Sequence, residues 1–166
     1  MEKFISNSIE DTKAFGKKIA KELNKGDVII LNGDLGAGKT ALVTGVASYW
    51  QKENEVASPT FTIVNEIVLT DDLSLFHFDV YRLEDEDEFY AIGGEEYFEK
   101  GITFMEWGDT IKNALPKEYL EIKIDKDLVG YWSGRSSIPL RERRCSSLSE
   151  GWSIYQLRCL HDCYGW

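Results

Sequence analysis

The spacing of apolar residues predicts a helix near the start of the chain and a buried strand soon after it. Apolar residues recur every four positions from Phe15 to Leu23, which is the spacing of one helical face. Ser8, with an acidic residue three positions later, is typical of a helix N-terminus, and we expect the helix to end in a left-handed cap at Gly26. The wholly apolar run 28–31 then predicts a central strand that is covered on both faces.

The pattern beyond this strand alternates between helix-like and strand-like segments. After a glycine-rich loop, a helix is expected from Thr40 to about Gln51. Further strands are expected at 62–69, 74–81, 101–107 and 119–124, and helix-like acidic stretches at 84–92 and 108–115 separate the later ones. Strands and helices that alternate in this way predict an α/β sandwich with a mainly parallel central sheet.

Composition divides the chain near Leu128. Before that point the basic residues are lysines with the exception of Arg82, whereas beyond it there is no lysine, and five arginines and all three cysteines appear together. The apolar periodicity is lost over the same stretch. We therefore divide the chain into a folded domain, residues 1–128, and an atypical tail, residues 129–166.

Two interpretations of the tail are open. Clustered arginine and tryptophan favour interfaces, which would make the tail a small interaction segment. The other interpretation is a segment foreign to the domain, from a shifted reading frame or an appended end. We favour the second, because the change of basic residue accompanies the loss of periodicity. The stretch 159–163, CLHDC, leaves only Cys145 as a fourth zinc ligand at an unusual separation, so no metal site is expected there.

Length and charge narrow the class of protein. A chain of 166 residues with 43% hydrophobic residues is enough for one globular domain. The formal net charge of −10 disfavours direct binding to nucleic acid and leaves open a role through a basic partner. The start of the chain lacks a signal-peptide core and no apolar run is long enough to span a bilayer, so a cytoplasmic protein without membrane contact is expected.

The clearest chemical pattern is the glycine loop Gly33–Thr40, in which four residues separate Gly33 from the sequence Gly-Lys-Thr. It directly follows the apolar strand and directly precedes a helix, which is the context that a P-loop requires. The glycines let backbone N–H groups turn toward phosphates, and the helix N-terminus adds its positive end. We expect Lys39 to reach the β- and γ-phosphates and the Thr40 hydroxyl to ligate magnesium. A glycine turn with an incidental lysine is the alternative, and the correct flanks argue against it.

Two carboxylates follow later strands. Asp79 ends the second apolar strand, where a Walker B carboxylate would stand, although a lone aspartate there is as often a cap or turn residue. Glu106 ends the third apolar strand at the same expected edge, and its alternative is a solvent-exposed strand end. Two carboxylates and a threonine at one edge suit a magnesium–nucleotide site. Glu106 would also orient the attacking water.

Two short motifs have ambiguous meanings. The segment 58–61, SPTF, resembles a switch segment in which Thr60 senses the γ-phosphate, but a plain turn held by Pro59 is nearly as well supported. The segment 24–27, NKGD, matches a guanine-reading motif literally. It lies at the end of a helix before the P-loop strand, so we interpret it as a helix cap and do not expect GTP specificity.

Four ordered segments, GDLGAGKT, SPTFTIVNE, FHFDVYRLED and MEWGD, together resemble the TsaE (YjeE) family of bacterial P-loop ATPases, from about residue 8 to residue 127. The resemblance implies that residues 1–128 are a P-loop ATPase domain with a three-layer α/β/α fold, using ATP and Mg2+. It implies a role in making threonylcarbamoyladenosine (t6A) at position 37 of tRNA. It further implies weak hydrolysis in support of the TsaB–TsaD complex, with tRNA contacted only indirectly.

The resemblance also implies a set of site residues. The catalytic residues would be Lys39, Asp79 and Glu106, and the metal ligands would be Thr40 and Glu106. The nucleotide-binding residues would be Ile9, Thr12, Gly33, Asp34, Leu35, Gly36, Ala37, Gly38, Lys39, Thr40, Ala41 and Asp79. Trp107 belongs to the last motif without an assigned role, its alternative being a core aromatic, and the arginine that the family has after the 119–124 strand has no match here.

Two other classes of function compete with a partner-dependent ATPase. A small-molecule kinase would need an arginine-rich lid to clamp its transferred phosphate, and Arg82 is the one arginine before the tail. A nucleotide-gated binding module would use the bound state rather than hydrolysis. The sequence disfavours the first and leaves the second open.

Overall fold

The computed structural model describes residues 2–126 and 154–159, and within them seven strands form one sheet in the order β1-β7-β6-β2-β5-β4-β3. The strands are β1 (Glu2–Ser6), β2 (Val28–Asn32), β3 (Val64–Thr70), β4 (Leu73–Asp79), β5 (Gly101–Glu106), β6 (Leu120–Lys126) and β7 (Ile154–Cys159). The α-helices are α1 (Ile9–Ala20), α2 (Lys39–Ser48), α3 (Glu86–Ala91) and α4 (Tyr97–Lys100). Shorter 3₁₀ segments are η1 (Glu53–Glu55), η2 (Gly94–Glu96) and η3 (Gly108–Ala114).

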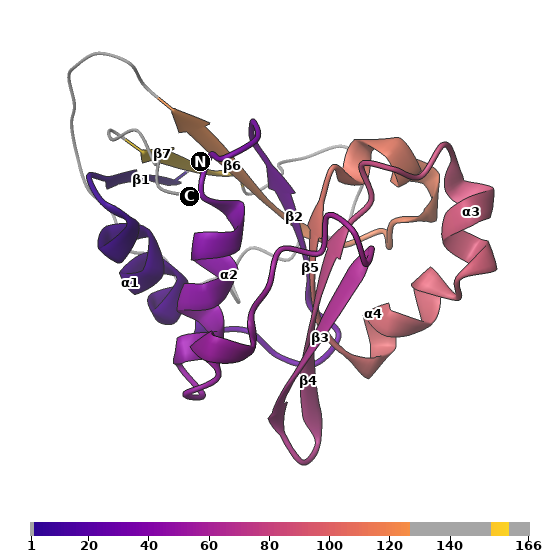
Figure 1. The fold of residues 1–166 in the computed structure, drawn as a ribbon, viewed down its shortest axis with the longest axis horizontal. Helices are drawn as coiled ribbons and strands as arrows, with labels where there is room; N and C mark the ends of the chain where they lie inside the picture. The colour runs from indigo at the N-terminus through magenta and orange to yellow at the C-terminus, as the bar shows by residue number, and fades with distance from the viewer. Residues whose placement is uncertain (1, 127–153, 160–166) are drawn as a thin grey trace.

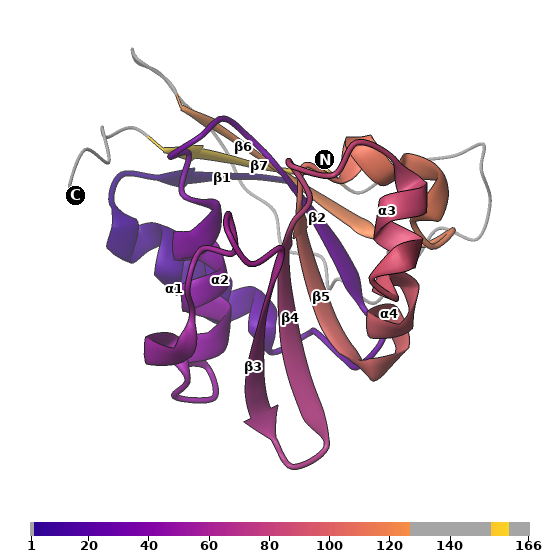
Figure 2. The same ribbon diagram turned by 45° about the vertical axis from the view of Figure 1, so that its right-hand side comes forward.

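The predicted three-layer architecture with a mainly parallel sheet is confirmed. Every neighbouring pair of described strands is parallel except β3 with β4, which form an antiparallel hairpin. Helices α1 and α2 lie on one side of the sheet and α3 and α4 on the other, and the β3–β4 hairpin extends beyond the layers (Figures 1 and 2). Among the described residues, no helix is long and apolar enough to cross a membrane.

Strand β2 is the centre of the fold, as its apolar run predicts. Its first four residues are buried, and β5 and β6 pair with it in parallel on either side. Because successive side chains of a strand point to opposite faces, Ile29 and Leu31 pack into the core beneath α1 and α2. Val28 and Ile30 pack into the second core, toward α3 and α4.

Helix α1 begins as expected but ends earlier. The Ser8 side chain accepts a hydrogen bond from the Asp11 N–H at 3.0 Å, which is the predicted N-cap. The helix stops at Ala20, so the prediction that it continues to Gly26 is wrong. A turn follows, in which the Asp27 N–H donates to the Asn24 carbonyl at 3.0 Å. Gly26 does adopt a positive φ of 91°, but it does so within this turn rather than as a helix cap.

Other boundaries also shift because tertiary packing decides them. The stretch 108–115 forms the 3₁₀ segment η3, which is kinked at Ile111, rather than a regular helix. Strand β1 and helix α4 have no counterpart among the predicted elements, because neither is long enough to display a clear period.

Part of the atypical tail lies in the sheet. Strand β7 pairs in parallel with β1 on one side and with β6 on the other, and so joins β1 to the rest of the sheet. The remainder of the tail, including Cys145 and the CLHDC stretch beyond Cys159, lies outside the described residues. The division of the chain at residue 128, and the origin of the tail, stay predictions.

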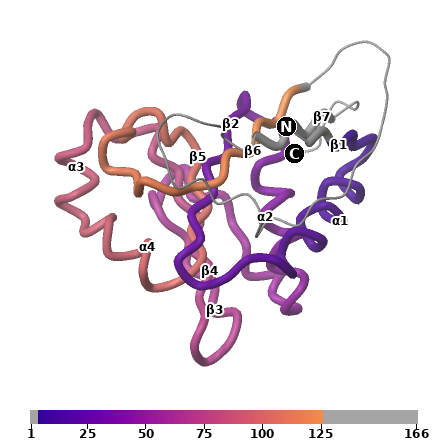
Figure 3. Tube along the Cα trace, turned by 180° about the vertical axis from the view of Figure 1, so that it is seen from behind, coloured from indigo at the N-terminus to yellow at the C-terminus, as the bar shows by residue number. Residues whose placement is uncertain are grey.

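Helices α1 and α2 cross in direct backbone contact, and two glycines make this possible. A Cβ atom added at Gly45 would lie 2.2 Å from the carbonyl oxygen of Lys13, and one added at Gly16 would lie 2.4 Å from that of Leu42. Both distances are too short for any side chain. The two helices, seen side by side from behind in Figure 3, therefore depend on glycine at these positions.

We predict that Gly45→Ala destabilises the protein by about 1–3 kcal/mol, because the added methyl group forces the two helices apart. Helix propensity alone would favour alanine by up to about 1 kcal/mol, so the sign of the change identifies the cause. The measurement is the free energy of unfolding from urea denaturation. Lys17→Ala, at an exposed position of α1, should change it by less than about 0.5 kcal/mol. A stabilised Gly45→Ala variant would contradict the prediction.

Candidate functional site

The glycine loop joins the end of β2 to the start of α2. Gly36 and Gly38 have φ values of 72° and 105°, a conformation that other residues adopt with strain. At Gly33 the backbone runs so close to β6 that an added Cβ would lie 2.5 Å from the Ile124 carbonyl oxygen. The loop therefore needs its glycines for its shape. Its first-turn N–H groups at α2 form the kind of helix N-terminus that binds phosphate.

Lys39 is buried although it carries a charge. Its side chain is 5% exposed, and its Nζ donates to the carbonyl oxygens of Gly33 at 2.7 Å and Asp34 at 3.0 Å. The same Nζ lies 3.4 Å from Glu106 Oε2 and 5.2 Å from the centre of the Trp107 ring. The ammonium group is thus stabilised by two loop carbonyls, a carboxylate and an aromatic face.

Glu106 stands between the other candidate side chains because of the strand order. Strand β5 lies between β2 and β4, and Glu106 is the register partner of Leu31 on one side and of Asp79 on the other. Its side chain is 7% exposed, so the alternative of a solvent-exposed strand end is excluded. Glu106 Oε2 faces Lys39 at 3.4 Å, and Oε1 lies 2.8 Å from His77 Nε2. The carboxylate therefore has a different partner on each oxygen.

His77 is a neighbour of the candidate site that the sequence reasoning did not single out. It is fully buried, and it stands two residues before Asp79 on β4, so both side chains point to the face that carries Glu106. The alternation of aromatic and polar residues in the segment 76–79, FHFD, indicates that His77 and Asp79 share a face. What the sequence did not contain was that β4 pairs with β5, which brings His77 to Glu106.

Asp79 is 7% exposed and is fixed locally. Its Oδ1 accepts from the Tyr81 N–H at 3.1 Å, and its own N–H donates to the Ile63 carbonyl at 2.9 Å. The first bond is that of a turn residue, the alternative that the sequence left open. Because Asp79 also lies at the same strand edge as Glu106, a role at the nucleotide stays a prediction.

Trp107 adopts a left-handed conformation, with φ of 63°, immediately after Glu106. For a residue other than glycine this costs on the order of 1–3 kcal/mol, and such strain clusters at functional sites. The turn that results brings the indole over the Lys39 ammonium and within 5.1 Å of the Tyr81 ring. Trp107 is half-buried at the site and packs against the second core.

The remaining loop residues differ in exposure. Thr40 and Ala41 lie in the first turn of α2 and are half-buried, whereas Asp34, Leu35 and Gly36 are exposed. Ala37 is buried, and its N–H donates to the Asp34 carbonyl at 3.0 Å. The tip of the loop is therefore open to solvent while its base is packed.

The two expected metal ligands, Thr40 and Glu106, both offer oxygen atoms. Among residues 2–126 and 154–159, no group of three His, Cys, Asp or Glu side chains is placed to hold a metal by itself. A threonine hydroxyl and one carboxylate, completed by phosphates and water, are what Mg2+ commonly uses. Thr40 and Glu106 fit that ion better than a metal that needs a complete protein cage.

Two candidate residues lie at the start of α1. Ile9 is 40% exposed, whereas Thr12 is 1% exposed. The Thr12 hydroxyl lies 2.7 Å from the hydroxyl of Ser6, and this hydrogen bond connects α1 to the end of β1. Contact of Ile9 and Thr12 with the nucleotide stays a prediction.

The segment 58–61 is an ordered turn. The Pro59 carbonyl accepts from the N–H groups of Thr62 at 3.0 Å and Ile63 at 2.8 Å, and the Thr60 hydroxyl lies 2.8 Å from that of Ser58. These hydrogen bonds are those expected of a plain turn, which was the alternative to a switch segment. Sensing of a phosphate by Thr60 stays a prediction.

The exposed end of this segment meets the one arginine before the tail. Phe61 is 83% exposed, and the Arg82 guanidinium lies 4.8 Å from the centre of its ring. Arg82 therefore faces an aromatic ring in this structure.

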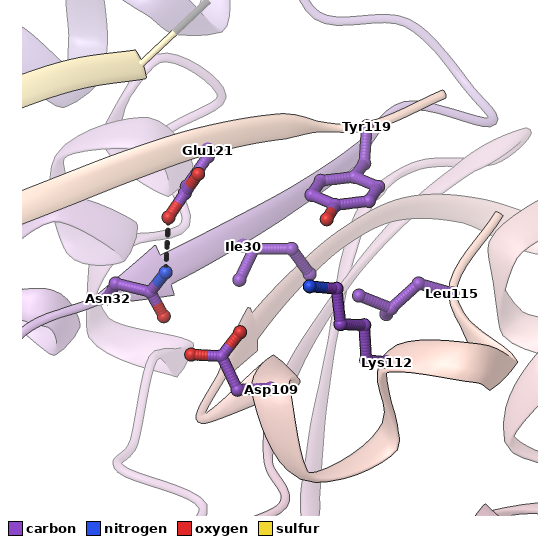
Figure 4. A pocket seen from close by; sticks show the side chains of 7 residues that line it. All are labelled: Ile30, Asn32, Asp109, Lys112, Leu115, Tyr119 and Glu121. Carbon is purple, nitrogen blue, oxygen red and sulfur yellow. Dashed lines mark hydrogen bonds between the residues drawn. The ribbon is translucent and has the colours of Figure 1, made fainter. Parts of the chain in front are cut away.

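A hollow of about 290 Å³ lies on the face of the sheet opposite to Glu106 (Figure 4). Burial raises the pKa of Tyr119, and the carboxylates of Glu121 and Asp109 add to the rise. Ile30, whose side chain points to the face of the sheet opposite to Glu106, forms part of the wall of the hollow. The hollow is therefore separate from the glycine loop site. It is lined by Ile30, Asn32, Asp109, Lys112, Leu115, Tyr119 and Glu121.

Comparison with known proteins agrees with the fold described above. The family model described as threonylcarbamoyl adenosine biosynthesis protein TsaE matches residues 6–131. The protein named tRNA threonylcarbamoyladenosine biosynthesis protein TsaE is 37% identical in Rickettsia bellii, covering 72% of this chain and 83% of that one. The protein of the same name in Bacillus subtilis is 45% identical, covering 70% and 73%. A crystal structure of Bacillus subtilis YdiB is similar, with a TM-score of 0.58, 36% identity and 76% of each chain covered. The chain belongs to the TsaE family.

Proposed function

We propose that this chain is a weak, partner-dependent ATPase that converts ATP and water to ADP and phosphate in support of t6A formation at adenosine 37 of tRNA. The observation that carries the proposal is the buried contact between Lys39 and Glu106, 3.4 Å apart at the base of the glycine loop. A buried lysine–carboxylate pair beside a phosphate-binding loop suits phosphate chemistry. The names of the relatives, which refer to tRNA threonylcarbamoyladenosine biosynthesis, supply the process.

The loop residues Gly33 to Thr40 would hold the phosphates through their backbone N–H groups. Lys39 would exchange its hydrogen bonds to the carbonyls of Gly33 and Asp34 for bonds to the β- and γ-phosphates. Mg2+, held by Thr40 and Glu106, would neutralise charge that develops on the phosphate oxygens. Asp79, at the same edge, would complete the polar surroundings of the nucleotide.

Glu106 would also orient the attacking water. Because His77 occupies Oε1, Oε2 is the oxygen that faces the loop. Hydrolysis by the chain alone would be weak, because a phosphoryl-transfer site gains much of its rate from an arginine directed at the phosphates. Arg82, the one arginine before the tail, lies over Phe61 instead. We therefore assign the stimulation of hydrolysis to the partner, the TsaB–TsaD complex.

Two alternatives make different demands on the same residues. A small-molecule kinase would need an arginine clamp over the transferred phosphate, and its ATP consumption would rise strongly with one metabolite and no protein partner. A nucleotide-gated binding module would need the loop but not hydrolysis. A substitution of Glu106 distinguishes a nucleotide-gated binding module from an ATPase, because only the ATPase needs the Glu106 carboxylate for turnover.

We predict that Glu106→Ala lowers ATP hydrolysis by about 10²-fold or more, because the group that orients the water is removed. Formation of t6A in the complete system should fall with it. The measurements are phosphate release in the presence of TsaB–TsaD and nucleoside mass spectrometry of the tRNA. Glu99→Ala, which removes an exposed carboxylate of α4, is the matched control and should change neither. If t6A formation survived while hydrolysis was abolished, the chain would be a gated module.

We predict that a chain of residues 1–128 binds nucleotide within about threefold of the full chain, a difference below about 1 kcal/mol. The reason is that every candidate site residue lies between Ile9 and Glu106. The measurement is titration with a fluorescent ATP analogue, alongside an intact mass of the full chain. Loss of binding on truncation would contradict the foreign-tail interpretation and would assign β7 to the domain.

A further inference from the structure

The strongest feature without a function is the contact of His77 with Glu106. The imidazole is fully buried, and its Nε2 lies 2.8 Å from Glu106 Oε1. Its other nitrogen, Nδ1, is buried and has no hydrogen-bond partner among the residues that the structure describes. A histidine kept only for packing would gain from replacement by an apolar residue, because an unpaired buried nitrogen costs free energy. The contact with Glu106 is therefore what accounts for a histidine at this position.

The chemistry of the two groups fixes the direction of the hydrogen bond. An ionised carboxylate only accepts, so Nε2 carries the hydrogen and donates it to Glu106 Oε1. A second hydrogen on Nδ1 would be buried without an acceptor among the described residues. The hydrogen that the surroundings satisfy is therefore the one on Nε2, which serves as a donor beside the carboxylate.

Because of this hydrogen bond, the two oxygens of the Glu106 carboxylate have different partners. With Oε1 bound to His77, the carboxylate cannot rotate without losing a buried hydrogen bond. Oε2 is then left facing Lys39, at 3.4 Å, and the glycine loop. Second partners of this kind orient metal-binding side chains and tune their affinity.

We propose that His77 is a positioning residue that fixes the Glu106 carboxylate so that Oε2 is presented to the magnesium–nucleotide. The proposal rests on the proposed function, because it assumes that Glu106 takes part in binding Mg2+ with the nucleotide. His77 acts through Glu106 and contacts neither ligand itself.

The test compares three variants of the full chain. His77→Leu removes the donor, His77→Gln keeps an N–H near the position of Nε2, and His77→Asn keeps an amide whose shorter side chain places its N–H nearer the position of Nδ1. The affinity of a fluorescent ATP analogue is measured in EDTA and then with increasing MgCl2. The melting temperature without nucleotide reports folding.

The half-saturating MgCl2 concentration should rise about 10–100-fold in His77→Leu and His77→Asn, and His77→Gln should stay near the wild type. Nucleotide affinity in EDTA should change little in any variant. A purely structural role would instead lower the melting temperature and both affinities together. An unchanged MgCl2 dependence in folded His77→Leu, or equal losses with and without MgCl2, would overturn the proposal.

The effect of MgCl2 on the wild type shows whether a failure belongs to this proposal or to the proposed function. If MgCl2 had no effect on nucleotide binding by the wild type, the proposed function and this inference would both fail. If the wild type responded and His77→Leu responded identically, only this inference would fail.

A second measurement uses the wild-type His77, so it does not depend on whether the His77 variants fold. The wild-type imidazole of His77 should show a hydrogen on Nε2 in nitrogen NMR spectra. Its signals are assigned as those that remain in His161→Gln. The Nδ1–H tautomer would overturn the proposal, because Nε2 would then have no hydrogen to donate.

Discussion

The contact between the Lys39 ammonium and the Glu106 carboxylate is the constraint on which the site depends. Both side chains are almost completely buried, and each would be costly there without the other. They come from distant parts of the chain, and only the parallel pairing of β2 with β5 brings the glycine loop beside the end of β5. The order of the central strands is therefore as important to the site as the loop sequence. A shift of β5 by one residue would turn Glu106 to the other face and leave Lys39 unpaired.

The same pairing places different kinds of side chain on the two faces of the sheet. On the face of α1 and α2, alternate residues of β4 and β5 end in His77, Asp79 and Glu106, and the core beneath them is apolar. On the other face, the aromatic side chains of Phe76, Phe78 and neighbouring residues pack with α3 and α4. Polar groups thus collect at one edge of one face, where the glycine loop and the first turn of α2 supply N–H groups.

The sequence predicted what is local and missed what depends on neighbours. The glycine loop, the buried run of β2 and the acids that end β4 and β5 are each visible within a few residues, so these three strands and their shared parallel edge were predicted correctly. The end of α1 at Ala20 and the 3₁₀ form of η3 depend on a turn and a kink that hydrophobic spacing does not encode. His77 could not be assigned for a different reason, since its meaning comes from the pairing of β4 with β5.

Charge balance links the nucleotide and its cation in the proposed function. Lys39 now neutralises Glu106, and its hydrogen bonds to the Gly33 and Asp34 carbonyls hold it within the loop. If phosphates draw the ammonium away, the buried Glu106 carboxylate loses its contact with Lys39 and keeps its hydrogen bond with His77. In the proposed function, Mg2+ bound at the same time would supply the positive charge that Glu106 has lost. Nucleotide and Mg2+ would therefore favour each other's binding, while the hydrogen bond with His77 would keep the carboxylate in place during the exchange.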